Sequence, residues 1–222
     1  MTRPEDTEAV LLDWDGVLHY WQGEGERAGE QAEGLPAGAI AAAAYGTDAY
    51  EYAKLGIYTD AQWRESVAEN LAQRFDGRGR EAVRMWSADR GRLANGAIEF
   101  LAQLRKRFVV ALLSDSTDIL VADLERFGVD AGFDHIFVSA HVGMTKPAPA
   151  LYRHAATAMG VPPAKIFVVD DLSVNLPGAR SVGMQVAHFS AGSSLSSIVC
   201  EHPIQEERSC LNRPGESGDL SV

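Results

Sequence analysis

Short, wholly apolar runs alternate along the chain with stretches in which apolar residues recur at helical spacing. Three of these runs end abruptly at a polar residue, as strands buried on both faces do, and they span residues 10–12, 108–113 and 166–169. Weaker strand candidates lie at 136–138 and 185–187. Helical patterns separate the strands at 98–105, 119–127, 151–159 and 174–182. This alternation predicts an α/β fold built on a doubly wound parallel sheet.

Residues 19–93 interrupt the alternation. They show no convincing strand, and helical stretches at 37–45, 60–75 and 80–89 follow a Gly- and Glu-rich segment expected to begin as a loop. We therefore expect a helical insertion at the carboxyl edge of the sheet, where open α/β sheets bind ligands. The predicted domains are an α/β core (1–18 and 94–189), a helical cap (19–93) and a loosely ordered C-terminal tail (190–222), which is rich in Ser, Gly and Pro.

Two helix starts have recognisable capping residues. Ser116 or Thr117 is the expected N-cap of the helix at 119–127, and Asp60, which follows Thr59, is the expected N-cap of the helix at 60–75. Gly128 is the expected stop of the first of these helices.

Composition and charge narrow the functional classes. The chain has 222 residues, of which 46% are hydrophobic and 23% charged, as in ordinary globular proteins. Its formal net charge of −11 argues against nucleic-acid binding. The longest apolar run, 39–45, is far shorter than the ~18 residues of a membrane span, and the N-terminus lacks a signal peptide's apolar core. With only Cys200 and Cys210, we expect a cytoplasmic protein without a disulfide scaffold.

Polar residues follow the predicted strands, at the point where each strand ends. They are Asp13 and Asp15, then Ser114, then Lys146, then Asp170 and Asp171. Because the carboxyl ends of parallel strands share one edge, we expect these groups to converge there. Carboxylate oxygens are the ligands that Mg²⁺ prefers, and a hydroxyl and an ammonium suit a phosphate. Such a site would neutralise charge while a phosphoryl group is transferred.

Each of these residues also has a purely structural explanation when taken alone. The first acid pair would suit many strand ends, Lys146 would suit a solvated turn, and Ser114 would suit a helix cap. Asn175 either donates a hydrogen bond in the site or only begins a helix. His19, just after the first acid pair, is the histidine expected to face substrate, with Asn175 a second candidate. The Tyr and Trp residues of the insertion are expected to be core.

Taken together, the motifs resemble the haloacid dehalogenase-like (HAD) hydrolase superfamily, in its capped phosphatase branch. They stand in the family's order over roughly residues 8–189: the segment 13–17 (DWDGV), Ser114, Lys146 before Pro147, and the pair Asp170-Asp171 with Asn175. The resemblance implies that Asp13 is a nucleophile that becomes an aspartyl phosphate. It implies that Asp15 first protonates the leaving group and then activates water.

The resemblance also assigns the remaining groups. It implies that Ser114 and Lys146 hold the phosphate. It implies that Asp171, with Asp170 close by, binds Mg²⁺ together with Asp13 and the backbone carbonyl of Asp15.

Two positions depart from the family pattern. Asp115 stands within the phosphate-binding motif where many relatives have Asn, and its carboxylate should repel phosphate unless it points away. After Val17 the chain reads Leu-His-Tyr-Trp (18–21), which is bulkier than in many sugar-phosphate members. A sugar-phosphate specificity is therefore not expected.

The leading functional prediction is a Mg²⁺-dependent phosphatase that hydrolyses a small phosphorylated metabolite through an aspartyl phosphate. A phosphomutase of the same family, or a degenerate member that only binds, remains open. The acid at position 15 disfavours a 2-haloacid dehalogenase or a phosphonatase, because those branches lack it. A phosphoacceptor receiver domain would place its acid pair on the first strand and its acceptor on the third, the reverse of the order here. The natural substrate and the oligomeric state are left open.

Overall fold

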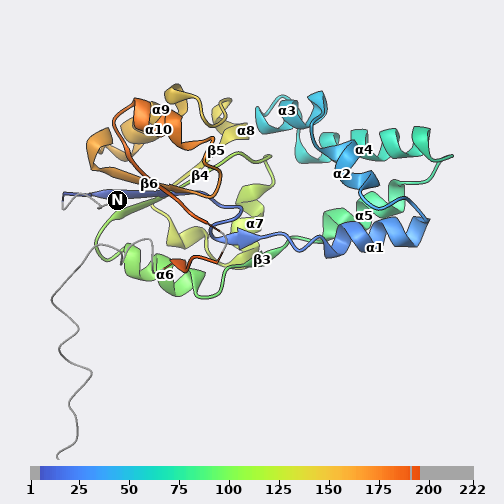
Figure 1. Ribbon diagram of the computed structural model, residues 1–222, viewed down its shortest axis with the longest axis horizontal. Helices are drawn as coiled ribbons and strands as arrows, with labels where there is room; N and C mark the ends of the chain where they lie inside the picture. The colour runs from blue at the N-terminus through green and yellow to red at the C-terminus, as the bar shows by residue number, and fades with distance from the viewer. Residues whose placement is uncertain (1–5, 191, 196–222) are drawn as a thin grey trace, which may run out of the picture.

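The computed structural model describes residues 6–190 and 192–195, which form an α/β core and a helical lobe beside it (Figure 1). The core sheet has five strands in the order β5-β4-β1-β6-β7, all paired in parallel. Their bounds are β1 (Ala9–Leu12), β4 (Val109–Ser114), β5 (His135–Val138), β6 (Ile166–Asp170) and β7 (Gln185–His188). All five predicted strands are present, and the predicted doubly wound α/β fold is confirmed.

Helices cover both faces of this sheet (Figure 1). On one face Val10 and Leu12 pack against α6 (Ala97–Leu104) and α7 (Leu120–Phe127). On the other, Ala9 and Leu11 pack against α9 (Pro149–Met159) and α10 (Leu176–Ser181). Successive side chains of a strand point to opposite faces, so a strand buried on both sides is apolar at every position. Short helices complete the core: α8 (Ser139–Val142), η1 (Asp130–Gly132) and η2 (Pro163–Lys165).

Five helices form the second unit, here called the helical lobe: α1 (Glu24–Glu33), α2 (Ala39–Ala44), α3 (Asp48–Lys54), α4 (Asp60–Arg74) and α5 (Arg80–Ala88). The lobe has its own buried cluster, which includes Ile40, Trp63, Leu71 and Trp86. It joins the core through β2 (His19–Tyr20) and β3 (Arg92–Leu93), which pair antiparallel as a two-stranded ribbon. The expectation of no strand in 19–93 was therefore wrong at its two ends, because a two-residue strand carries no periodicity.

Helix α1 occupies much of the segment expected to begin as a loop. Its Gly25 and Gly29 lower helix propensity, yet they let α1 approach α5 closely. A Cβ added at Gly29 would lie 2.5 Å from the carbonyl oxygen of Ala82 in α5. Close packing of α1 against α5 therefore explains why this helix has a glycine content typical of a loop. Helix α3 was not predicted either.

The two predicted caps differ from those observed. Helix α7 follows Ile119 without a side-chain cap, and Thr117 instead donates to Oδ1 of Asp60 at 2.9 Å. The N-cap of α4 is Thr59, which forms a capping box with Gln62. Asp60 is the first residue of α4, and it connects the helical lobe to the core.

The described chain continues slightly beyond the core boundary predicted at residue 189. Leu195 is buried in the same cluster as Phe189. The rest of the predicted tail, residues 196–222 with both cysteines, lies outside the described residues. No helix in the described part of the chain is long and apolar enough to cross a membrane.

Candidate active site

The ends of three neighbouring strands place acids and a hydroxyl at one edge of the sheet. Leu12 of β1 pairs with Leu112 of β4 and with Val169 of β6, so the residues that follow these pairs are neighbours. Asp13 continues β1, and its backbone N–H donates to the carbonyl of Val169 at 2.9 Å. Ser114 ends β4 and Asp170 ends β6, and both are buried.

Lys146 joins two of these carboxylates. Its Nζ lies 2.8 Å from Oδ1 of Asp13 and 2.8 Å from Oδ2 of Asp170, with only 3% of its side chain exposed. Burial alone would lower the pKa of Lys146, but the two carboxylates raise it well above its usual range, so the ammonium stays charged. Burial raises the pKa of Asp13 to about 7, with a further increase from Asp170, although Lys146 acts in the opposite direction.

Asp170 is fully engaged by donors of the protein. Besides Lys146, it accepts from Nδ2 of Asn175 at 2.9 and 3.1 Å and from the backbone N–H of Leu172 at 2.8 Å. Asn175 is buried at the start of α10. Of the two roles considered for Asn175, the structure therefore shows the hydrogen-bonding one, as a donor that orients Asp170, and a direct substrate contact stays a prediction.

A third acid completes a cluster. Asp13, Asp170 and Asp171 each offer a carboxylate oxygen within 4.8 Å of the others. Gly16 makes this approach feasible: its φ is +76°, and an added Cβ would lie 2.0 Å from Oδ2 of Asp171. Burial, followed by the charge of Asp170, raises the pKa of Asp171. An all-oxygen, acid-rich set of this kind fits a hard divalent cation such as Mg²⁺.

Asp15 lies at the mouth of the site, where its side chain is 46% exposed. Its Oδ1 accepts from Nε1 of Trp21 and pairs with Nδ1 of His19, both at 2.8 Å. The other ring nitrogen of His19 lies 2.8 Å from the carbonyl oxygen of Arg90. Both ring nitrogens of His19 therefore lie within hydrogen-bonding distance of an oxygen atom.

His19 does not face an open site. It is 1% exposed, and its ring stacks on Trp14 with centroids 5.1 Å apart. The structure places His19 between Asp15 and the chain segment that leaves the helical lobe. Contact between His19 and substrate stays a prediction.

Asp115, which departs from the family pattern, is hydrogen-bonded to the backbone of Lys146. Its Oδ1 accepts from the backbone N–H of Lys146 at 3.0 Å. Burial raises the pKa of Asp115. One of its oxygens is thus used to position the backbone of Lys146, a partner that spacing along the sequence does not reveal.

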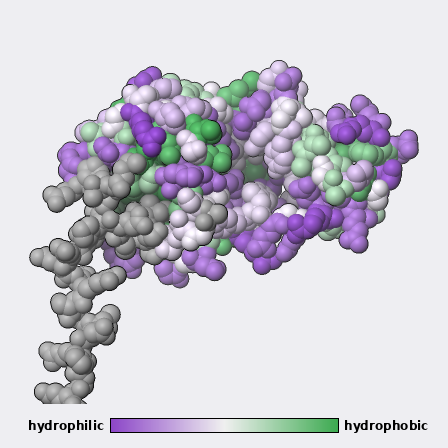
Figure 2. All heavy atoms as spheres, viewed as in Figure 1, coloured by the Kyte–Doolittle hydropathy of each residue, from purple (hydrophilic) through white to green (hydrophobic). Residues whose placement is uncertain are grey.

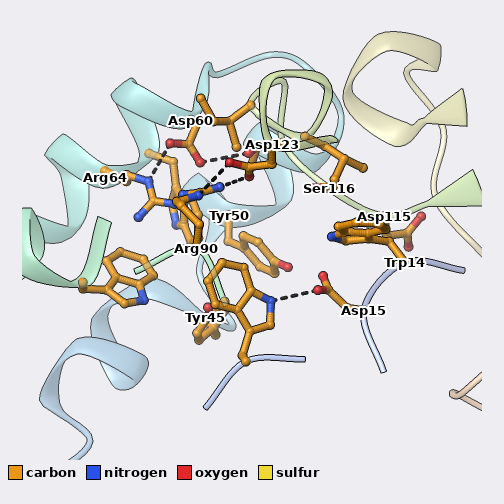
Figure 3. Close-up of a pocket in the computed structure, with 16 residues that line it drawn as sticks. Trp14, Asp15, Tyr45, Tyr50, Asp60, Arg64, Arg90, Asp115, Ser116 and Asp123 are labelled. Atoms are coloured by element: carbon orange, nitrogen blue, oxygen red, sulfur yellow. Dashed lines mark hydrogen bonds and ion pairs between the residues drawn. The ribbon is translucent and has the colours of Figure 1, made fainter. Parts of the chain in front are cut away.

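A cavity that is open to solvent lies between the helical lobe and the carboxyl edge of the sheet. Figure 2 shows the surface hollowed between the two units, and Figure 3 shows Asp15 and Asp115 on the core side of the cavity. Four aromatic residues of the lobe line it: Tyr45, Tyr50, Trp63 and Trp86. They come from separate segments of the lobe, and spacing along the chain does not indicate that they share a cavity. Trp63 and Trp86 are buried in the lobe's core cluster, as expected, whereas Tyr45 is 46% exposed.

These features define a class of protein: a doubly wound α/β core with an acidic, lysine-bridged site at the carboxyl edge of its sheet, beside an inserted helical lobe. A family model described as haloacid dehalogenase-like hydrolase matches residues 7–183. The chain belongs to this family of hydrolases.

Two curated relatives show the range of similarity. A phosphoserine phosphatase of Thermus thermophilus is 33% identical over 157 residues, which cover 64% of this chain and 61% of the relative. A glyceraldehyde 3-phosphate phosphatase of Pyrococcus furiosus is 30% identical over 100 residues, 44% of this chain and 42% of the relative. The matched part therefore spans less than two thirds of either relative.

Solved structures share the fold at low identity. A HAD family enzyme of Bacteroides thetaiotaomicron, solved with magnesium and inorganic phosphate, has a TM-score of 0.72 and 18% identity, covering 86% of this chain and 98% of that one. The L-2-haloacid dehalogenase of Xanthobacter autotrophicus has a TM-score of 0.63 and 23% identity, covering 88% and 82%. A structure solved with magnesium and phosphate and a dehalogenase structure thus share this fold, so the fold alone does not identify the reaction.

Proposed function

We propose that this chain is a divalent-metal-dependent phosphatase that hydrolyses a small phosphorylated metabolite through an aspartyl phosphate on Asp13. The observation that carries the proposal is the ammonium of Lys146 between Asp13 and Asp170, beside the third acid, Asp171. This arrangement combines a carboxylate nucleophile with the positive charge that a phosphoryl group needs. The names of the two curated relatives support phosphate ester hydrolysis, and the low cysteine content supports a cytoplasmic site of action.

In the first proposed step, an oxygen of Asp13 attacks phosphorus while the bond from phosphorus to the leaving oxygen breaks. Asp15 gives its proton to that leaving oxygen. Lys146 and Ser114 hold the phosphoryl oxygens. A bound Mg²⁺ would supply further neutralisation of the phosphate charge.

In the second step, water attacks the phosphorus of the aspartyl phosphate. The carboxylate of Asp15, deprotonated by the first step, takes a proton from that water. The bond from phosphorus to Asp13 breaks, which releases inorganic phosphate and restores both carboxylates to their starting states. His19 and Trp21 hold Asp15 at the mouth of the site, so they act as positioning residues.

The contacts refine the expected set of metal ligands. Asp170 already accepts four hydrogen bonds from the protein, whereas the carboxylate of Asp171 lies next to Gly16, which has no side chain. We therefore assign Asp13 and Asp171, with the backbone carbonyl of Asp15, as the groups that hold the ion. Asp170 orients Lys146.

The helical lobe is assigned the role of a cap. It encloses the cavity next to Asp15, and Asp60 of α4 bonds Thr117 and Asp118 of the core at 2.9 and 2.7 Å. A lid in this position excludes bulk water and selects small substrates.

The proposal is tested by hydrolysis of 4-nitrophenyl phosphate by the full chain. We expect turnover with Mg²⁺ and its loss after EDTA treatment, with recovery when Mg²⁺ is restored. Full activity after exhaustive EDTA treatment would exclude the metal role. No turnover with Mg²⁺, together with binding of inorganic phosphate, would favour the degenerate binding member. Transfer of phosphate to a second hydroxyl compound, in place of its release, would favour the phosphomutase.

A further inference from the structure

The cavity between the lobe and the core has a continuous aromatic wall. Tyr45 and Tyr50 meet edge to face with centroids 5.2 Å apart, and Tyr50 lies 4.9 Å from Trp63. Trp63 in turn meets Trp86 at 5.3 Å. Tyr45 keeps 46% of its surface exposed, so the wall offers ring surface to a ligand as well as to its neighbours.

A fifth ring connects this wall to the reacting groups. Trp21 lines the same cavity, is 49% exposed, and donates to Asp15 at 2.8 Å. Figure 3 shows Asp15 with Tyr45 and Tyr50 nearby. The body of a molecule whose leaving oxygen lies at Asp15 would therefore extend among these rings.

The charged residues of the cavity are already paired. Arg64 bonds Asp60 at 2.5 Å and lies 4.6 Å from the ring of Trp86. Arg90 forms a two-pronged pair with Asp123. Among the described residues that line the cavity, these arginines are the only Lys or Arg side chains.

The other polar residues that line the cavity also disfavour a substrate that carries a second anionic group. Asp15 and Asp115 add carboxylates to the core side. Burial raises the pKa of both Tyr45 and Tyr50, so their hydroxyls stay protonated and neutral. A leaving group with a carboxylate or a second phosphate would meet no free cation here, and it would lose hydration without compensation.

We propose that the substrate is a phosphomonoester whose leaving group carries an uncharged, planar aromatic body that stacks against Tyr45 and Trp21. This inference rests on the proposed phosphatase function and adds the substrate class to it. Edge-to-face and offset ring contacts supply the specificity, and the paired arginines exclude leaving groups that carry a second anion.

The test compares alkyl phosphates of similar leaving-group reactivity, so that binding decides the result. We expect kcat/KM for 2-phenylethyl phosphate to exceed that for O-phosphoserine and 3-phosphoglycerate by roughly tenfold or more, as one good aromatic contact allows. Equal or higher kcat/KM for either anionic compound would overturn the inference. Acetyl phosphate, which has no aromatic body, separates the two proposals: if it is hydrolysed, only the substrate class has failed, and if it is not, the phosphatase function has failed as well.

Variants at Tyr45 test whether its ring produces the preference for a substrate with an aromatic body. Tyr45→Leu removes the ring and Tyr45→Phe keeps it, and because Tyr45 is half exposed both chains should fold. We expect the ratio of kcat/KM for 2-phenylethyl phosphate to that for acetyl phosphate to fall several-fold in Tyr45→Leu and to stay near its original value in Tyr45→Phe. Tyr52→Leu is the matched control, because Tyr52 is an exposed tyrosine of the same lobe outside the cavity lining. An equal change in the Tyr45→Leu and Tyr52→Leu variants, or none in either, would overturn the assignment.

Discussion

Lys146 is the residue on which the charge balance of the site depends. One buried ammonium faces the carboxylates of Asp13 and Asp170, with Asp171 alongside. Three carboxylates and one ammonium leave an uncompensated negative charge when all are ionised, and buried charges are costly unless they are paired. The divalent cation proposed for this site would complete the pairing.

The two acids that follow β1 should give different variants. We expect Asp13→Asn to abolish turnover, because the nucleophile is lost. Asp15→Asn should lower kcat by about 10²–10⁴-fold, the usual value of general acid–base assistance, with a smaller loss for nitrophenyl phosphate, whose leaving group departs without a proton. The phosphoenzyme should accumulate in Asp15→Asn, and intact-protein mass spectrometry after rapid acid quench would detect it.

The control for that experiment is the double variant, which should show neither turnover nor added phosphate. Activity retained in Asp13→Asn, or an Asp15→Asn chain with no trapped phosphate and no dependence on the leaving group, would contradict the covalent mechanism.

Asp13, Ser114 and Asp170 could be predicted as edge residues because each stands where an apolar run ends abruptly, whereas Lys146 lies on a loop beyond α8. The partners of these residues could not be predicted. Asp170 and Asp171 are adjacent in sequence, yet the first is held by Lys146 and Asn175 while the second faces Gly16. Likewise, the burial of His19 depends on the ring of Trp14, which no spacing rule indicates.

At the scale of elements, the contact between α1 and α5 depends on small residues. We expect Gly29→Ala to lower stability by about 1–3 kcal/mol, because the added methyl would meet the carbonyl of Ala82 at 2.5 Å. This loss should outweigh the gain in helix propensity of up to ~1 kcal/mol. Urea denaturation monitored by circular dichroism measures the change.

Gln31→Ala, on the exposed side of the same helix, serves as the matched control and should leave stability unchanged or slightly raised. If Gly29→Ala also raised stability, α1 would not be packed against α5 as described.

The core elements were predictable and parts of the lobe were not, for a physical reason. Strands of a doubly covered sheet are apolar at every position, so β1, β4 and β6 are visible as short runs. Helix α1 could not be predicted from the local pattern, because its glycines are typical of a loop. They make sense only through the close contact of α1 with α5. The β2–β3 ribbon pairs residues more than seventy positions apart, and local pattern carries no information about such a pairing.

At the scale of the whole molecule, folding, protonation and ion binding are linked. The pKa of Asp13 is raised to about 7 in the folded chain from a usual value near 4. Its contribution to stability is thus present below about pH 4 and is lost as pH rises through about 7. Because an ion binds the deprotonated carboxylate, the increase in Tm on adding Mg²⁺ should grow from pH 5 to pH 8, as measured by calorimetry against an EDTA reference.

In the Asp13→Asn chain this growth with pH should largely disappear, because the titrating ligand is gone. A Mg²⁺ effect on Tm that is equal at pH 5 and pH 8 in the original chain would show that Asp13 does not titrate in this range.

Because β2 and β3 pair with each other, the chain enters and leaves the helical lobe at the same place. His19 pairs with Leu93 and Tyr20 with Arg92, so a tight two-residue Asn-Gly turn could close the ribbon directly. The lobe's buried cluster is separate from the two clusters of the core. In modular terms, the α/β scaffold can accept a different insertion at this point without any change in its strand order, and a new insertion would have to supply its own hydrogen-bond donor to Asp15 in place of Trp21.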